Sequence, residues 1–232
     1  SRIIPSRKHF LNPNAPEGQQ GLYFMGVQQE NAYERAAKLW NRAIERFNAG
    51  DKEKAYHDLG RVAHLLMDCS QPEHAMAIDH FAKRTMDGKP AWDHVGSPLE
   101  NFAASESLDR LLMVASVNND TSFVPENDMR TLFYAMARET TGINAPAAYN
   151  DALAAYFVKA SGDDATTHWN GSYTSRLAAN FIIESDARTI TSYVIPRLMK
   201  RLEKLVDLWR IKGAMQQRIE QDTSAILPHQ LM

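Results

Sequence analysis

Residues 64–74, HLLMDCSQPEH, place three side chains of metal-binding type in an otherwise apolar segment. His64 and Asp68 are four residues apart, so on a helix they lie on one face about one turn from each other. His74 follows Pro72, where a helix is expected to end and the chain can turn back toward Asp68. A buried carboxylate is costly without a partner, so Asp68 must be paired, hydrogen-bonded or bound to a metal.

Two interpretations of this cluster follow from the residues alone. In the first, a core histidine is hydrogen-bonded to Asp68 and His74 lies at the surface. In the second, one divalent metal uses all three groups, because imidazole and carboxylate ligands are typical of catalytic zinc. The second interpretation gains weight from further candidate ligands in the sequence, which are His9, His80, His94 and Glu100.

Other polar residues receive structural interpretations. His57 lies seven residues before His64, on the same helix face, and we expect a structural role for it. Cys69 is the only cysteine, which excludes an internal disulfide, and a small buried apolar side chain is favoured over a reactive or metal-binding thiol. His168 and His229 lie in polar segments and are expected to be solvated.

A longer stretch, YHDLGRVAHLLMDCSQPEHA (56–75), resembles the signature of the bacterial zinc-dependent phospholipases C. That family has a glycine four residues before a histidine, followed by an aspartate and a Pro-x-His step. The matching positions in this sequence are Gly60, His64, Asp68, Pro72 and His74.

Two flanking segments extend the resemblance. KHFLNP (8–13) is similar to the family's His-Phe-x-Asp-Pro segment, with His9 at the ligand position and Asn12 in place of the aspartate. DHVGSPLENF (93–102) is similar to the family's His-x3-Glu-Asn-Phe segment. His94 and Glu100 are six residues apart here, where the family has four, so a loop rather than one helical turn would have to bring them together.

The resemblance implies a site for up to three Zn²⁺ ions. The first ion would be held by His9, His64 and Asp68, and the second by His74, His94 and Glu100. Asp68 would bridge to a third ion, whose other ligands in the family come from the N-terminal tryptophan, a nearby histidine and an aspartate. We therefore expect that this chain lacks an N-terminal ligand-bearing segment, completes two zinc shells at best, and is disordered over residues 1–20.

The activity implied by the resemblance is hydrolysis of phospholipids to diacylglycerol and a phosphorylated head group. Zinc ions would offset the charge of the phosphodiester, and a zinc-activated water would be the nucleophile. Glu100 and Asp68 are the candidate catalytic residues, with Glu100 placed to orient or deprotonate the water. The family context also predicts a secreted or periplasmic monomer that meets its substrate at a membrane surface.

Two other functions remain open. Single-strand-specific zinc nucleases resemble this family in fold and in the His-Asp-His helix, but a His-x3-Asp step follows that helix in them. Glu100-Asn101-Phe102 therefore favours the phospholipase. The third possibility is a catalytically inactive helical relative that binds a metal or lipid.

The elements that must position these residues are helical. Apolar residues recur at three- and four-residue intervals, with no strand alternation, which predicts an all-α fold of one multi-helix domain over residues 1–232. The metal-ligand helix is expected at its centre and a long helix at its C-terminal end, bent at Pro196. The predicted helices cover 28–47, 52–69, 99–117, 127–139, 146–160 and 173–215, with a long loop at 75–98 and a frayed tail after 218.

Composition narrows the functional classes further. The 232 residues are 44% hydrophobic and carry a formal net charge of −2, which is typical of a globular chain and shows no basic surplus for nucleic acid. No apolar run approaches the ~20 residues of a membrane span. We therefore expect no nucleic-acid partner and no transmembrane segment.

Overall fold

The computed structural model describes the backbone of residues 5–24, 26–77, 83–84, 90–91, 99, 125–161 and 173–226. Side chains are described for 7–24, 26–77, 99, 125–157 and 185–212. Most of the described residues are helical, which confirms the predicted all-α class. None of the described helices has the length and apolarity that crossing a bilayer requires.

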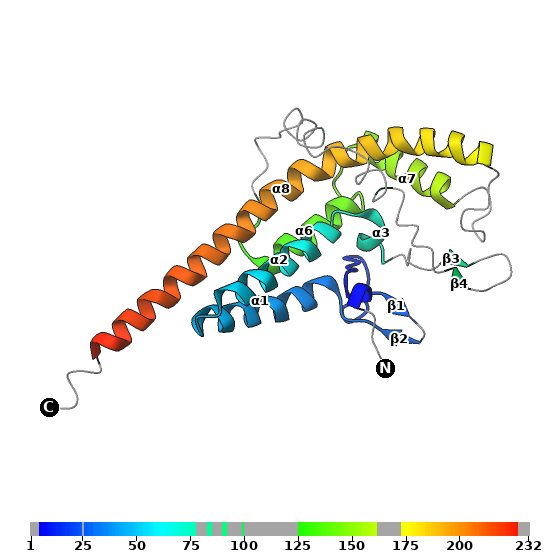
Figure 1. Ribbon diagram of the computed structural model, residues 1–232. Coiled ribbons are helices and arrows are strands. Elements are labelled where there is room, and N and C mark those ends of the chain that lie inside the picture. Colours follow the sequence, from blue (N-terminus) through cyan, green and yellow to red (C-terminus); the bar gives the residue numbers. More distant parts are fainter. Residues whose placement is uncertain are drawn as a thin grey trace.

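The described helices follow one another along the chain with two small hairpins between them (Figure 1). The helices are a 3₁₀ turn η1 (Pro5–Lys8), α1 (Ala32–Asn48), α2 (Lys52–Asp68), α3 (Pro72–Ala75), α6 (Met129–Thr140), α7 (Ala147–Ser161) and α8 (Tyr173–Ile226). The antiparallel pairs are β1 (Tyr23–Phe24) with β2 (Val27–Gln28), and β3 (Lys83–Arg84) with β4 (Pro90–Ala91). The sequence predicted neither hairpin, because two-residue strands are too short to show alternation.

Local signals set the ends of α1 and α2. Asn31 caps α1 in a capping box, accepting a hydrogen bond from the Glu34 backbone while the Glu34 side chain accepts one from the Asn31 backbone. The predicted start at residue 28 is wrong, since Gln28 belongs to β2. The Asp51 side chain caps α2 by accepting from the Lys54 backbone.

Helices α1 and α2 pack side by side, and α6, α7 and α8 complete one hydrophobic cluster with them (Figure 1). Trp40 of α1 and Trp209 of α8 meet edge to face, with ring centroids 5.4 Å apart. Helix α8 is one element of 54 residues with Pro196 inside it, and its axis changes direction between its yellow and orange parts. The backbone remains helical to Ile226, so the expected fraying after residue 218 is wrong as far as that residue, beyond which the chain lies outside the described residues.

The N-terminal segment is ordered over its described residues. Phe10 and Leu11 are fully buried, and two backbone hydrogen bonds tie them to other elements, from Leu11 N to His74 O (3.0 Å) and from Ala32 N to Phe10 O (2.9 Å). The expected disorder of residues 1–20 is therefore wrong for this part of the chain. Burial of these two adjacent apolar residues anchors the segment that carries His9.

Candidate metal centre

His64 and Asp68 belong to the last two turns of α2. The face of α2 that packs in the core carries Val62, Leu65 and Leu66, which are all buried. His64 lies toward solvent with 57% of its side chain exposed, whereas the Asp68 side chain is only 12% exposed. The helix ends where Gln71 becomes extended before Pro72, and α3 begins with that proline at its first position.

His9 is placed over this end of α2 by contacts from α3. The His9 carbonyl oxygen lies 3.1 Å from the His74 ring Nδ1. The Leu11 backbone N–H donates a hydrogen bond to the His74 carbonyl oxygen. His74 is buried and stacks on the Phe10 ring, with centroids 4.7 Å apart and an interplanar angle of 13°. His74 therefore fixes the backbone that presents His9.

The chemistry of this contact also defines the His74 tautomer. A carbonyl oxygen can only accept, so Nδ1 carries the hydrogen and Nε2 carries the lone pair in the neutral ring. The His74 ring centroid is 6.3 Å from that of His9. His74 is thus a neighbour of the cluster, although its ring nitrogens are not among the atoms that converge there.

Three ligand atoms converge, one each from His9, His64 and Asp68, and all lie within 4.8 Å of one another. His9 Nδ1 is 2.8 Å from Asp68 Oδ2, and His64 Nε2 is 3.5 Å from the same oxygen. Two ligands bound to one zinc at about 2.1 Å are roughly 3.0–3.4 Å apart for bond angles between about 90° and 110°. Small side-chain adjustments would therefore allow these three atoms to share one ion.

The Asp68 oxygen gives an independent reason to consider a cation. Within the described residues, Oδ2 is buried and accepts no hydrogen bond of good geometry, even though His9 Nδ1 approaches it closely. A buried carboxylate oxygen in this state is costly. A metal ion would neutralise it, and binding one would require His9 Nδ1 and Asp68 Oδ2 to move slightly apart from their present 2.8 Å.

The remaining predicted ligands are not placed. His80, His94 and Glu100 lie outside the described residues. The second zinc shell, with His74, His94 and Glu100, therefore remains a prediction. Cys69 is buried in the hydrophobic cluster, and burial raises the pKa of its thiol well above the usual value. A neutral thiol in apolar surroundings agrees with the favoured interpretation of Cys69 as a small hydrophobic side chain.

Two polar residues at this end of the molecule were missed in the sequence. The Tyr156 hydroxyl of α7 donates to Glu73 Oε1 of α3 at 2.6 Å and accepts from the Leu99 backbone at 2.9 Å. This buried bridge anchors the residue that directly precedes Glu100 in the sequence. Glu73 is visible in the sequence as the variable residue of the Pro-x-His step. Nothing in the residue spacing indicates that Tyr156 is its partner.

Helix α2 also places Gly60 on its open side. No described heavy atom lies within 4 Å of where a Cβ on Gly60 would be, so packing does not require the glycine. Gly60 precedes His64 by one turn and is itself exposed. The glycine of the motif therefore leaves the surface next to His64 uncovered.

The chain matches no model of a known protein family and no curated protein sequence. Fold and geometry thus define an all-α protein with a candidate metal centre made of two imidazoles and one carboxylate.

Proposed function

We propose that the protein is a metal-dependent phosphodiester hydrolase that cleaves phospholipids, with His9, His64 and Asp68 holding a zinc ion. The observation that carries this proposal is the convergence of two imidazole nitrogens and one buried carboxylate oxygen within 4.8 Å. Their chemistry suits zinc, which accepts nitrogen and oxygen ligands in catalytic sites and keeps a coordination position open. The similarity of residues 56–75 to the zinc phospholipase C signature directs the proposal toward phospholipids.

A zinc ion held by these residues would place positive charge at the phosphodiester oxygens and lower the pKa of the water that attacks phosphorus. Asp68 is mostly buried and provides the negative charge that holds the cation at the protein surface. His64 is more than half exposed, so this ligand lies on the side that a substrate can approach. His74 positions His9 through its carbonyl, and Glu100 is the proposed residue that orients or deprotonates the water.

Zinc content and hydrolysis can be measured on the same preparations. The zinc-loaded chain should bind at least one ion and hydrolyse a chromogenic phosphocholine ester. His64→Ala should lose that ion, and its turnover should fall at least about a hundredfold. Mutation of residues that only support metal ligands already lowers metal affinity or activity by about 10–100-fold. His229→Ala is the matched control, since the sequence gives it no ligand role.

Three results would contradict the proposal in different ways. Equal zinc content in the His64→Ala variant and the unaltered chain would mean that the three residues do not form the site. Hydrolysis of single-stranded DNA without hydrolysis of the ester would favour the nuclease. Zinc binding without either activity would favour an inactive metal-binding relative.

A further inference from the structure

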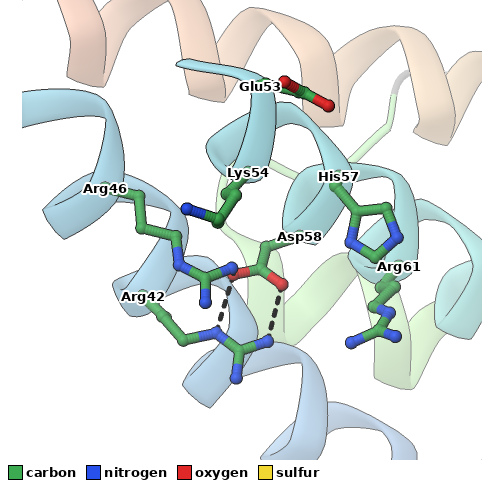
Figure 2. Close-up of a pocket in the computed structure, with 7 residues that line it drawn as sticks. All are labelled: Arg42, Arg46, Glu53, Lys54, His57, Asp58 and Arg61. Atoms are coloured by element: carbon green, nitrogen blue, oxygen red, sulfur yellow. Dashed lines mark hydrogen bonds and ion pairs between the residues drawn. The ribbon is translucent and has the colours of Figure 1, made fainter. Parts of the chain in front are cut away.

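A second polar site lies between α1 and α2, nearer the turn that joins them. Figure 2 shows Arg42 and Arg46 of α1 reaching toward Asp58 of α2, with His57 and Arg61 on neighbouring positions of α2. The pocket has a volume of about 460 Å³. Four of its lining residues are cationic and two are acidic, and one of the cations, Lys54, is paired with Asp51 outside the lining at 2.6 Å. The whole chain, in contrast, has a net charge of −2.

Asp58 is the fixed point of this pocket. Its side chain is fully buried and accepts from Arg42 Nε at 2.7 Å and Arg42 Nη2 at 2.6 Å. Arg46 Nη1 donates to the same carboxylate at 2.7 Å. The Arg42 hydrogen bonds outweigh the effect of burial and lower the Asp58 pKa, so the carboxylate is ionised at neutral pH. Two guanidinium groups are thereby held in fixed orientations at the surface.

The arginines retain donors that Asp58 does not use. Each guanidinium has five N–H bonds, of which Arg42 directs two and Arg46 one at the carboxylate. About a third of each of these side chains is exposed to solvent. Arg61 is exposed and makes no hydrogen bond or short ion pair with any described residue, although its charge attracts Asp58. The unused N–H groups therefore surround a space open to solvent.

A purely structural ion pair does not account for this arrangement. One arginine is enough to neutralise Asp58 and to tie α1 to α2, and the bidentate Arg42 already does so. Arg46 and Arg61 are also attracted to Asp58, but they add positive charge beyond the one charge that Asp58 can neutralise, and a bound anion would offset it. Planar guanidinium groups with several free donors match the oxygens of a phosphate group better than those of a smaller anion.

We propose that the pocket formed by Arg42, Arg46, Asp58 and Arg61 binds a phosphate monoester group. Asp58 fixes the orientation of the Arg42 and Arg46 guanidinium groups, and Arg61 donates to the phosphate from the neighbouring turn of α2. The ligand is a dianion, and the three arginines together carry two positive charges more than Asp58 neutralises. The site requires no metal, so it can be tested independently of the proposed zinc centre.

The test measures stabilisation of the full chain by inorganic phosphate in the presence of a metal chelator. A ligand that binds only the folded state raises the unfolding temperature in a concentration-dependent way. Arg61→Gln removes an exposed residue whose only role in the folded pocket is a charge attraction to Asp58, with no hydrogen bond to a described residue, so its folding is expected to be little affected. It should weaken phosphate binding by at least about tenfold, the equivalent of one charge-assisted hydrogen bond. Arg210→Gln, an equal change of charge at an exposed position of α8, should bind as the unaltered chain does.

Equal phosphate binding in the Arg61→Gln and Arg210→Gln variants, or no binding by the unaltered chain, would overturn the proposal. Vesicles then distinguish the source of the phosphate. If vesicles of phosphatidic acid in phosphatidylcholine retain the chain but not Arg61→Gln, the pocket reaches a lipid head group. If they retain neither while soluble phosphate binds, the pocket takes a soluble phosphate monoester, and either result supports the site.

Discussion

Asp58 combines complete burial with two arginine partners, and this makes its ionisation important for stability. Its pKa is lowered in the folded protein, so the unfolded chain, with a pKa of about 3.9, binds the proton more readily. The stabilisation is therefore fully present above pH about 4 and is lost as the pH falls through the folded-state pKa. Asp58→Asn should cost about 1–3 kcal/mol at pH 7 through the unmade charged hydrogen bonds.

The measurement is urea unfolding of the unaltered chain and Asp58→Asn at pH 7 and at successive pH values below 4. The difference between them should shrink as the pH falls, because only the carboxylate titrates. Asp207→Asn is the matched control, since Asp207 is exposed and makes only a 3.5 Å pair with Arg210. A difference that is the same at every pH would show that the charge of Asp58 does not contribute.

At the scale of single residues, helical spacing explains what could be predicted. His64 and Asp68 were placed together because four residues correspond to about one turn of α2. The role of His9 was available only through resemblance, because tertiary packing of Phe10 and Leu11 brings it to the site. The Glu73–Tyr156 bridge was not predicted at all, since a contact between α3 and α7 leaves no periodic trace in either segment.

At the scale of elements, Gly60 lies inside the continuous helix α2, and packing gives no reason for a glycine there. An interior helical glycine costs roughly 0.5–1 kcal/mol relative to alanine. Since a Cβ at this position meets no described atom, Gly60→Ala should stabilise the protein by about that amount. Chemical denaturation of the metal-free chain measures the change, with Ala63→Gly in the same helix as the reciprocal control. A destabilised Gly60→Ala variant would contradict the open surface described beside His64.

The helices themselves were the most predictable part of the fold. The expected limits of α2, α6 and α7 are within two residues of those observed, because caps and prolines mark them in the sequence. The start of α1 was expected four residues early, because the apolar repeat begins only at Ala32, where Asn31 caps the helix, and Gln28 pairs in the β1–β2 hairpin. The predicted helix at 99–117 lies outside the described residues, apart from Leu99.

At the scale of the whole molecule, Arg201 connects the long helix to the rest of the fold. It is fully buried on α8 and donates to Glu126 and to Glu139 of α6, with four N···O distances between 2.9 and 3.0 Å. Burial alone would lower its pKa, but the hydrogen bonds to both glutamates outweigh burial and raise it. The guanidinium is therefore permanently charged, and its removal takes four hydrogen bonds from Glu126 and Glu139, of which Glu139 keeps a 3.6 Å pair with Arg197.

Arg201→Met should destabilise the protein by about 3 kcal/mol or more, because breaking a buried pair leaves uncompensated charge. The triple variant Arg201→Met, Glu126→Gln, Glu139→Gln should recover part of this loss, since it removes both carboxylate charges, and the recovery is incomplete because Arg197 loses its pair with Glu139. Guanidinium unfolding monitored by tryptophan fluorescence reports both, because Trp209 lies on the same helix. If the triple variant is less stable than the single one, the network does not act through charge compensation.

The length of α8 determines how the molecule moves in water. Its 54 residues give a contour of about 80 Å at 1.5 Å per residue, and Figure 1 shows it extending past the other helices. A compact chain of 232 residues would have a radius of gyration of only about 17 Å. Friction on so long a rod slows translation and end-over-end rotation more than mass alone would. A single chain of 26.2 kDa should therefore leave a gel-filtration column earlier than a globular chain of the same mass, and a direct measurement of mass by light scattering is needed for its stoichiometry.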